Sequence, residues 1–179
     1  MQPARDTGAH RDGTRRLALH ARSGLLLRRA VNLRPATVAE QNAIRALLVE
    51  GALPVDDLDE ADVRFIVAER DGAVIGAIGL QPFDRVGLLR SLVVRAQARG
   101  EGVGAALVQA LEAHASERGL ERLVLLTLTA APFFAARGYA VMARDDAPAV
   151  VQASAEFRSL CPASATCMSK MLPPTGNSR

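Results

Sequence analysis

Alternating apolar and polar positions predict a chain of short strands separated by helices. Strands are expected at Val31–Arg34, Phe65–Glu69, Ala73–Leu80, Leu88–Val94, Leu123–Leu128, Val141–Ala143 and Ala165–Leu172. Asp71-Gly72 separates two of them and is a typical hairpin turn, because both residue types tolerate positive φ angles. The segment Leu123–Leu128 is nearly all apolar, as expected of a strand buried on both faces.

Helical periodicity occupies the intervening segments. Helices are predicted from Thr37, with a capping box to Glu40, as far as a left-handed Gly51; from Val103 to Arg118; between Pro132 and Gly138; and over Pro148–Phe157. A loop is expected at Pro82–Gly87. This alternation predicts an α/β (α+β) fold with a mixed, mostly antiparallel central sheet flanked by helices.

Charge separates the amino-terminal end from the rest of the chain. Residues 1–34 hold eight arginines against two aspartates, whereas residues 35–179 carry fourteen basic and seventeen acidic groups. We therefore expect a disordered Arg-rich extension over 1–30, one domain over 31–172 and a disordered tail over 173–179. A mildly acidic domain argues against nucleic-acid binding, and the apolar run Leu25–Leu27 is too short to span a membrane.

Cysteine and histidine are sparse. Cys161 and Cys167, with His10, His20 and His114, have neither zinc-site spacing nor a disulfide framework. The sequence thus predicts no metal and a reducing, cytoplasmic location. His114 falls at the edge of the apolar stripe of its helix, where a packing role is expected.

The stretch Leu88–Val108 is the strongest chemical signal, because a strand runs into a glycine-rich loop and then directly into a helix. Gly100, Gly102 and Gly104 leave backbone N–H groups uncovered, and the helix adds the positive end of its dipole. Arg99 stands beside the loop and is able to hydrogen-bond a diphosphate. The segment therefore predicts a diphosphate-binding loop.

Two other nucleotide-binding loops fit this stretch less well. Gly100–Ala105 satisfies the dinucleotide pattern G-x-G-x-x-G/A, but Glu121 precedes the next strand, whereas that fold requires an acid at the strand's end. A P-loop requires Gly-Lys-Ser/Thr, and the chain's single lysine is Lys170.

Gln97–Gly102 matches the pattern Q/R-x-x-G-x-G/A and resembles motif A of the GNAT acetyltransferase superfamily. Ala131–Tyr139 is similar to the second motif of that family, F-Y-x-x-x-G-F, and the resemblance extends from about Leu33 to Leu172. Within the superfamily, RPAT, LRSLVV, RGEGVG and EFRSLCPASATCM are similar to stretches of the arsenic-resistance-operon N-acetyltransferases.

The resemblance implies acetyl-CoA as co-substrate, with its pantetheine arm along the strand that ends at Val94. The residues it places against the coenzyme are Leu92, Val93, Val94, Gln97, Arg99, Gly100, Gly102, Val103, Gly104 and Ala105. An N–H near Val93 or Val94 would face the thioester carbonyl as an oxyanion donor. Phe134 stands where the family usually has a tyrosine that protonates the departing thiolate.

Arg90, Ser91, Asp56 and Asp57 are the candidate acceptor-binding residues. A guanidinium on an apolar strand requires an anion, either a carboxylate or arsinate-like group of the substrate or an internal acid such as Asp84. Asp56 and Asp57 either meet the substrate ammonium or belong to a solvated acidic loop.

The strand that carries Arg90 lacks the carboxylate that serves many GNAT enzymes as a base. Ser91 could assist the acceptor through its hydroxyl. The candidate bases elsewhere are Glu50, Glu69 and Glu156, which the sequence does not rank.

The leading hypothesis is an acetyl-CoA-dependent N-acetyltransferase that modifies the amine of a small amino-acid-like substrate, in arsenic or antibiotic detoxification. A coenzyme-A-binding sensor domain with little catalysis is the alternative, and an arsenic-sequestering protein that uses Cys161 and Cys167 is a more distant one. The expected partners are the small-molecule amine and, in a homodimer, a second copy of the chain.

Overall fold

The computed structural model describes residues 30–174. The predicted extension over 1–30 lies outside the described residues except for Ala30. Of the predicted tail over 173–179, the description includes Pro173 and Pro174.

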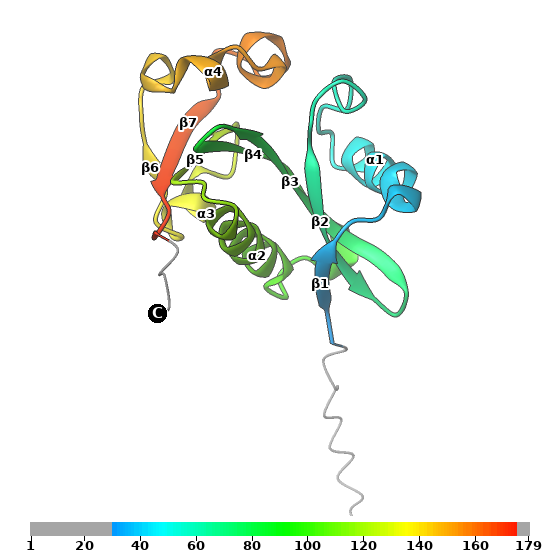
Figure 1. The fold of residues 1–179 in the computed structure, drawn as a ribbon. Coiled ribbons are helices and arrows are strands. Elements are labelled where there is room, and N and C mark those ends of the chain that lie inside the picture. Colours follow the sequence, from blue (N-terminus) through cyan, green and yellow to red (C-terminus); the bar gives the residue numbers. More distant parts are fainter. Residues whose placement is uncertain (1–29, 175–179) are drawn as a thin grey trace, which may run out of the picture.

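One seven-stranded sheet organises the chain (Figure 1). In spatial order its strands are β1 (Asn32–Pro35), β2 (Arg64–Arg70), β3 (Ala73–Phe83), β4 (Val86–Val94), β5 (Arg122–Thr127), β7 (Thr166–Met171) and β6 (Ala140–Val141). Neighbouring strands are antiparallel except β4 and β5, which are parallel. The predicted mixed, mostly antiparallel sheet is confirmed.

Helices connect these strands. They are α1 (Gln41–Glu50), α2 (Val103–Glu117), α3 (Ala131–Ala135) and α4 (Ala149–Gln152), with 3-10 turns η1 (Val38–Glu40), η2 (Ala96–Ala98) and η3 (Arg144–Asp146) and a π-helical segment, η4 (Glu156–Leu160). The C-cap of α2 is Arg118, one residue before the predicted Gly119, and Gly119 has the left-handed φ of 79° that the sequence predicts at this helix end.

Several predicted boundaries are wrong. The single helix expected over Pro148–Phe157 divides into α4 and η4, because the Ser154 hydroxyl accepts the Phe157 N–H at 3.4 Å and competes with regular helical bonding. The left-handed residue after α1 is Ala52 (φ 54°), whereas Gly51 has φ −82°.

One further predicted strand and one predicted loop also differ in the structure. The strand expected over Val141–Ala143 is only Ala140–Val141, paired with β7. The expected loop at Pro82–Gly87 is instead mostly strand, with Pro82 opposite Gly87. Proline is tolerated there because β2 stops pairing with β3 at Leu80, so one side of the strand needs no N–H donor.

The predicted capping box is present and lies at the start of the 3-10 turn η1, which leads directly into α1. The Thr37 N–H donates to Glu40 Oε2 at 2.8 Å, and Arg34 donates to both oxygens of Glu40. Hydrogen bonding by Arg34, and then by Thr37, lowers the pKa of Glu40 to about 2. A short local sequence signal is therefore sufficient to start this helix.

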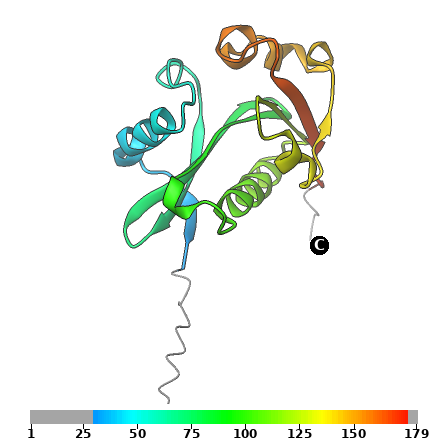
Figure 2. The same cartoon turned by 180° about the vertical axis from the view of Figure 1, so that it is seen from behind.

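Helices cover the two faces of the sheet differently (Figures 1 and 2). Side chains of α2 and α3 pack on one face with Leu89, Leu123 and Met168. On the other face, α1 packs on β2, β3 and β4, while the α4–η4 segment packs on β4, β5 and β7. Two separate apolar clusters therefore share that face, and β4 contributes to both.

Candidate active site

The central feature of the site is the parting of β4 from β5. The two strands pair only at Val86–Leu88 with Arg122–Val124, and β5 continues with β7 as its partner. Beyond Leu88 the main-chain groups on that side of β4 therefore have no β5 neighbour. A cavity of about 580 Å³ lies here, lined by the outer halves of both strands.

A β-bulge interrupts β4 beside this cavity. Ser91 has a left-handed φ of 57°, and the pairing with β3 shifts between Ala77 and Gly79. The bulge therefore reverses which alternate side chains of β4 point to each face of the sheet. Leu88 and Val93, one even and one odd in number, pack on the same face, beside α4 and α1 respectively. Val94 packs on the opposite face, with α2. Sequence patterning missed this bulge, because Leu89–Leu92 contains no glycine or other local signal for it.

The glycine-rich loop has the open backbone that the sequence predicts. Gly100 and Gly102 have φ angles of 77° and 85°, and a Cβ added to either would meet nothing within 4 Å. Gly102 is the N-cap of α2, so the first N–H groups of that helix lie at the loop, outside the helical ladder. A Cβ on Gly104 would touch the Phe133 ring at 3.6 Å, an ordinary contact. Left-handed backbone, rather than space, requires glycine at the first two positions.

Arg99 joins this loop to the cavity. Its Nε donates to the Val94 carbonyl at 2.9 Å, and the exposed side chain lines the cavity. Glu101 forms an ion pair with Arg70 at the end of β2, which ties the loop to the β2–β3 hairpin. A diphosphate would meet free amides and a guanidinium, which fits the donor set that anions require.

The predicted coenzyme residues fall into two groups. Leu92, Val93, Val94 and Arg99 line the cavity. The others lie on η2, on the glycine loop and in the first turn of α2: Gln97, Gly100, Gly102, Val103, Gly104 and Ala105.

Arg90, which lines the cavity, is the centre of a buried ion cluster. Its Nη1 and Nη2 donate to Asp57 Oδ2 and Oδ1, both at 2.6 Å, and Nη2 lies 3.0 Å from Glu156 Oε1. Only 4% of Arg90 is exposed. Burial alone would lower the pKa of Arg90, but hydrogen bonding by Asp57 and the two carboxylate charges raise it.

This cluster corrects the predicted partner of Arg90. Asp84, suggested from the sequence, is exposed in the turn between β3 and β4, and the observed partners are Asp57 and Glu156. Asp56, the other predicted ammonium ligand, is exposed and absent from the cavity wall, whereas Ser91 lines the cavity and its hydroxyl accepts from Arg90 Nε at 3.4 Å.

The cavity wall on this side carries Glu156 and Cys161. The Cys161 thiol donates to Glu156 Oε2 at 2.8 Å. Burial, and next this hydrogen bond, raise the pKa of Cys161 to about 12. Arg144 holds the segment by donating to the carbonyls of Phe157, at 2.6 Å, and Cys161, at 3.2 Å.

The structure separates the three glutamates that the sequence left unranked. Glu50 is exposed at the end of α1, and Glu69 pairs with Arg34. Glu156 alone of the three lines the cavity.

Phe134 is buried on α3 and lines the cavity, so no hydroxyl is available at that position. The Tyr139 ring lies 5.4 Å from the Phe134 ring, and burial, followed by the charge of Glu112, raises the Tyr139 pKa far above its usual value. Tyr139 is therefore a core residue and does not replace the missing acid.

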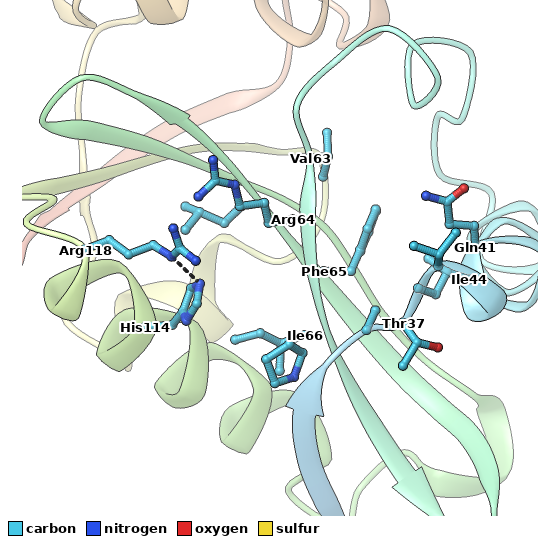
Figure 3. A pocket seen from close by; sticks show the side chains of 13 residues that line it. Thr37, Gln41, Ile44, Val63, Arg64, Phe65, Ile66, His114 and Arg118 are labelled. Carbon is cyan, nitrogen blue, oxygen red and sulfur yellow. Dashed lines mark hydrogen bonds between the residues drawn. The ribbon is translucent and has the colours of Figure 1, made fainter.

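A second hollow lies at the start of β2 (Figure 3). In it Arg118 donates to His114 Nε2 at 2.8 Å, and burial, with the charge of Arg118, lowers the pKa of His114. Phe65 and Ile44 lie across β2 from this pair (Figure 3). The lining residues include neither the glycine loop nor the Arg90 cluster, and His114 is half-buried in this hollow.

Within residues 30–174, no group of three or more His, Cys, Asp or Glu side chains is placed to hold a metal ion. Over the same range, no helix combines the length and the apolar character that crossing a bilayer requires.

The parted parallel strands, the bulge and the amide-rich loop before α2 form a cavity with a loop beside it that is able to bind an anion. The family model described as Acetyltransferase (GNAT) family matches residues 36–139. The chain belongs to this family.

Several proteins similar to this chain are named amino-acid acetyltransferase. The protein of that name from Shewanella oneidensis is 30% identical over 150 residues, which cover 76% of this chain and 34% of the relative. The chain thus spans about a third of that relative's length. The "IAA acetyltransferase" of Azospirillum brasilense is 35% identical over 77 residues, covering 42% of this chain and 50% of that protein.

Solved structures have the same fold. N-acetylglutamate synthase from Neisseria gonorrhoeae, complexed with coenzyme A and N-acetyl-glutamate, has a TM-score of 0.70 and 23% identity, covering 80% of this chain and 35% of that chain. A Mycobacterium tuberculosis protein in complex with CoA and NLQ has a TM-score of 0.67 and 26% identity, covering 79% of this chain and 99% of its own. The predicted GNAT fold is thereby confirmed.

Proposed function

We propose that the protein transfers the acetyl group of acetyl-CoA to the amine of a small amino-acid-like substrate. One observation carries the proposal: the cavity between β4 and β5 is lined both by Arg99, which directly precedes the glycine loop, and by Arg90 and Glu156 of the buried ion cluster. If the diphosphate of acetyl-CoA is bound at the loop, its thioester would therefore lie between the loop and Glu156, a carboxylate suited to an ammonium group.

Backbone groups would hold the coenzyme. The amides around Gly100 and Gly102 would bind the diphosphate, with Arg99 adding a guanidinium. The pantetheine arm would lie along β4 in place of the missing β5 partner, as an added strand does. An amide at Val93 or Val94, beyond the bulge, would face the thioester oxygen, and one such donor contributes about 10²–10³ in rate.

The departing thiolate would receive no proton from Phe134. A general acid contributes about 10²–10⁴, so turnover is expected to be slow compared with a tyrosine-bearing relative. A thiol of pKa ~8.5 is nevertheless a fair leaving group near neutral pH, so the missing hydroxyl is compatible with catalysis.

Several relatives are named amino-acid acetyltransferase, which favours an amino acid as acceptor. A narrower proposal, an amino-acid arsenical or a similar antibiotic as substrate, rests on the four stretches that resemble arsenic-resistance N-acetyltransferases. Sequestration of arsenic by thiols has little support, because Cys167 is buried and the pKa of Cys161 is raised to about 12. The unpaired thiols favour the cytoplasm as location, and a homodimer is retained as a proposal.

Phe134 favours one second candidate, a domain that binds coenzyme A as a sensor. Incubation with acetyl-CoA and a panel of amino acids, including an amino-acid arsenical, while free thiol is followed, separates the two functions. Amine-dependent thiol release supports the transferase. Tight coenzyme binding in calorimetry without release for any amine supports the sensor and contradicts the transferase.

A further inference from the structure

The buried cluster around Arg90 has one more negative than positive group. Arg90 is 4% exposed, and its two partners, Asp57 and Glu156, are 8% and 6% exposed. Burying a charge without a partner is costly, so a surplus carboxylate in such a place favours a cationic ligand. The same surplus disfavours a substrate carboxylate at Arg90.

The two carboxylates are engaged to different extents. Both oxygens of Asp57 accept from Arg90 at 2.6 Å, and Asp57 borders a separate hollow with Gln81 and Ser154. Glu156 uses Oε1 for Arg90, whereas Oε2 meets the Cys161 thiol, a weak donor. Glu156 also lines the cavity that would hold the thioester. The Glu156 Oε2 position is therefore the one that an incoming ammonium can take.

We propose that Glu156 binds the ammonium of the acceptor through Oε2, displacing the Cys161 thiol, and takes its proton as the new bond forms. This inference rests on the proposed acetyl transfer and deepens it, because it identifies the base and the charge of the acceptor. Arg90 is then a positioning residue that fixes the Glu156 carboxylate through Oε1.

Two protons leave the acceptor nitrogen in this step. The ammonium gives one proton to Glu156 Oε2, and the nitrogen lone pair forms the C–N bond at the thioester carbonyl carbon. The C–S bond breaks and its electron pair leaves with sulfur. The second nitrogen proton then neutralises the thiolate directly or through solvent, and Glu156 returns its own proton to solvent. The products are an amide and free coenzyme A.

The charged or titratable groups near Glu156 come from four segments of the chain. Arg90 comes from β4, Asp57 from the loop before β2, Cys161 from the segment after η4, and Arg144 from η3 through the carbonyls of that segment. Asp57 gives a matched control, because it shares the Arg90 partner and the burial of Glu156 but is not part of the cavity wall.

The test compares Glu156→Gln with Asp57→Asn, which each remove one charge from the same guanidinium. We expect Glu156→Gln to lower kcat/KM at pH 7 by about 10² or more, the usual contribution of a general base. Its kcat/KM should then rise about tenfold per pH unit as the free amine forms in solution, whereas the wild type stays level over the same range. Asp57→Asn should lose less than about tenfold and keep the wild-type pH profile.

Equal losses and parallel pH profiles in the two variants would overturn the assignment of Glu156, because neutralising Arg90 would then be its whole role. Glu156→Asp keeps the charge and so protects folding, and it should still lower kcat/KM because the shorter side chain withdraws Oε2; wild-type activity there would also contradict the proposal. Cys161→Ala should lower the KM for the amine by removing the competing donor.

Coenzyme A binding by calorimetry in each variant separates this inference from the proposed function. Wild-type turnover with indistinguishable Glu156 and Asp57 variants refutes only the role of Glu156. Coenzyme binding with no turnover for any amine refutes both.

Discussion

The proposed coenzyme end and the proposed acceptor end of the site are formed by different kinds of chemical group, backbone amides at one and side chains at the other. The loop Arg99–Gly104 is one continuous stretch, and it acts through backbone amides and glycine geometry. The proposed acceptor end is lined by Arg90, Glu156 and Cys161, and Asp57 pairs with Arg90 from outside the cavity wall, so three separate segments contribute. A site made of consecutive backbone groups leaves a short motif in the sequence, whereas one made of distant side chains leaves none.

Substitutions at the two ends should also change different properties, ligand affinity at one and stability at the other. A change in the loop should affect ligand affinity, since few core contacts depend on it. A change in the cluster should affect stability first, because each buried charge depends on the others.

Replacement of Arg90 by methionine should have the largest effect. It leaves Asp57 and Glu156 buried without a counter-charge, a loss of about 3–5 kcal/mol in the free energy of unfolding. Urea denaturation measures this loss. Arg34→Met is the matched control, because Arg34 also pairs with two carboxylates but its side chain is 29% exposed; about 1 kcal/mol or less is expected there. Similar losses in both variants would show that burial of the cluster does not matter.

Gly102→Asp should mainly affect affinity. The residue has φ 85°, and the new carboxylate would stand against the diphosphate, so the Kd for coenzyme A should rise about tenfold or more, equivalent to about 1.4 kcal/mol. Calorimetry checks the Kd. Gly119→Asp is strained in the same way, at φ 79°, but lies at the other end of α2. Equal weakening by both substitutions would refute the proposed position of the diphosphate.

The smallest effect concerns Cys161, with Cys167→Ala as background so that one thiol remains. Because the folded pKa is raised to about 12 from 9.0, iodoacetamide alkylation should keep accelerating above pH 9, and stability should fall as pH rises from 9 toward 12. Glu156→Gln removes a hydrogen bond that disfavours the thiolate and should speed alkylation at pH 8, about tenfold for each pKa unit. A rate that levels off near pH 9 in the parent would contradict the raised pKa of Cys161, and an unchanged rate in Glu156→Gln would contradict the contribution of the Glu156 contact.

Local signals predicted much of the fold. Asp71 and Gly72 have the positive φ angles, 53° and 77°, that the hairpin requires. The capping box is present, and Gly119 is left-handed directly after the C-cap of α2. The loop predicted from Pro82 is wrong, because proline is tolerated in β3 beyond the point where β2 stops pairing, and the sequence does not show where β2 ends. The helix over Pro148–Phe157 divides because a hydroxyl competes for a backbone donor, and periodicity carries no information on that competition.

The sequence by itself determined the order of strands and helices, the glycine loop and the family, because each depends on residues close together in the chain. The tertiary structure alone decided that β4 parts from β5, that Ser91 bulges, and that Arg90 pairs with Asp57 and Glu156 rather than Asp84. The physical reason is that a buried charge takes whichever counter-charge the packing of distant segments brings within hydrogen-bond distance.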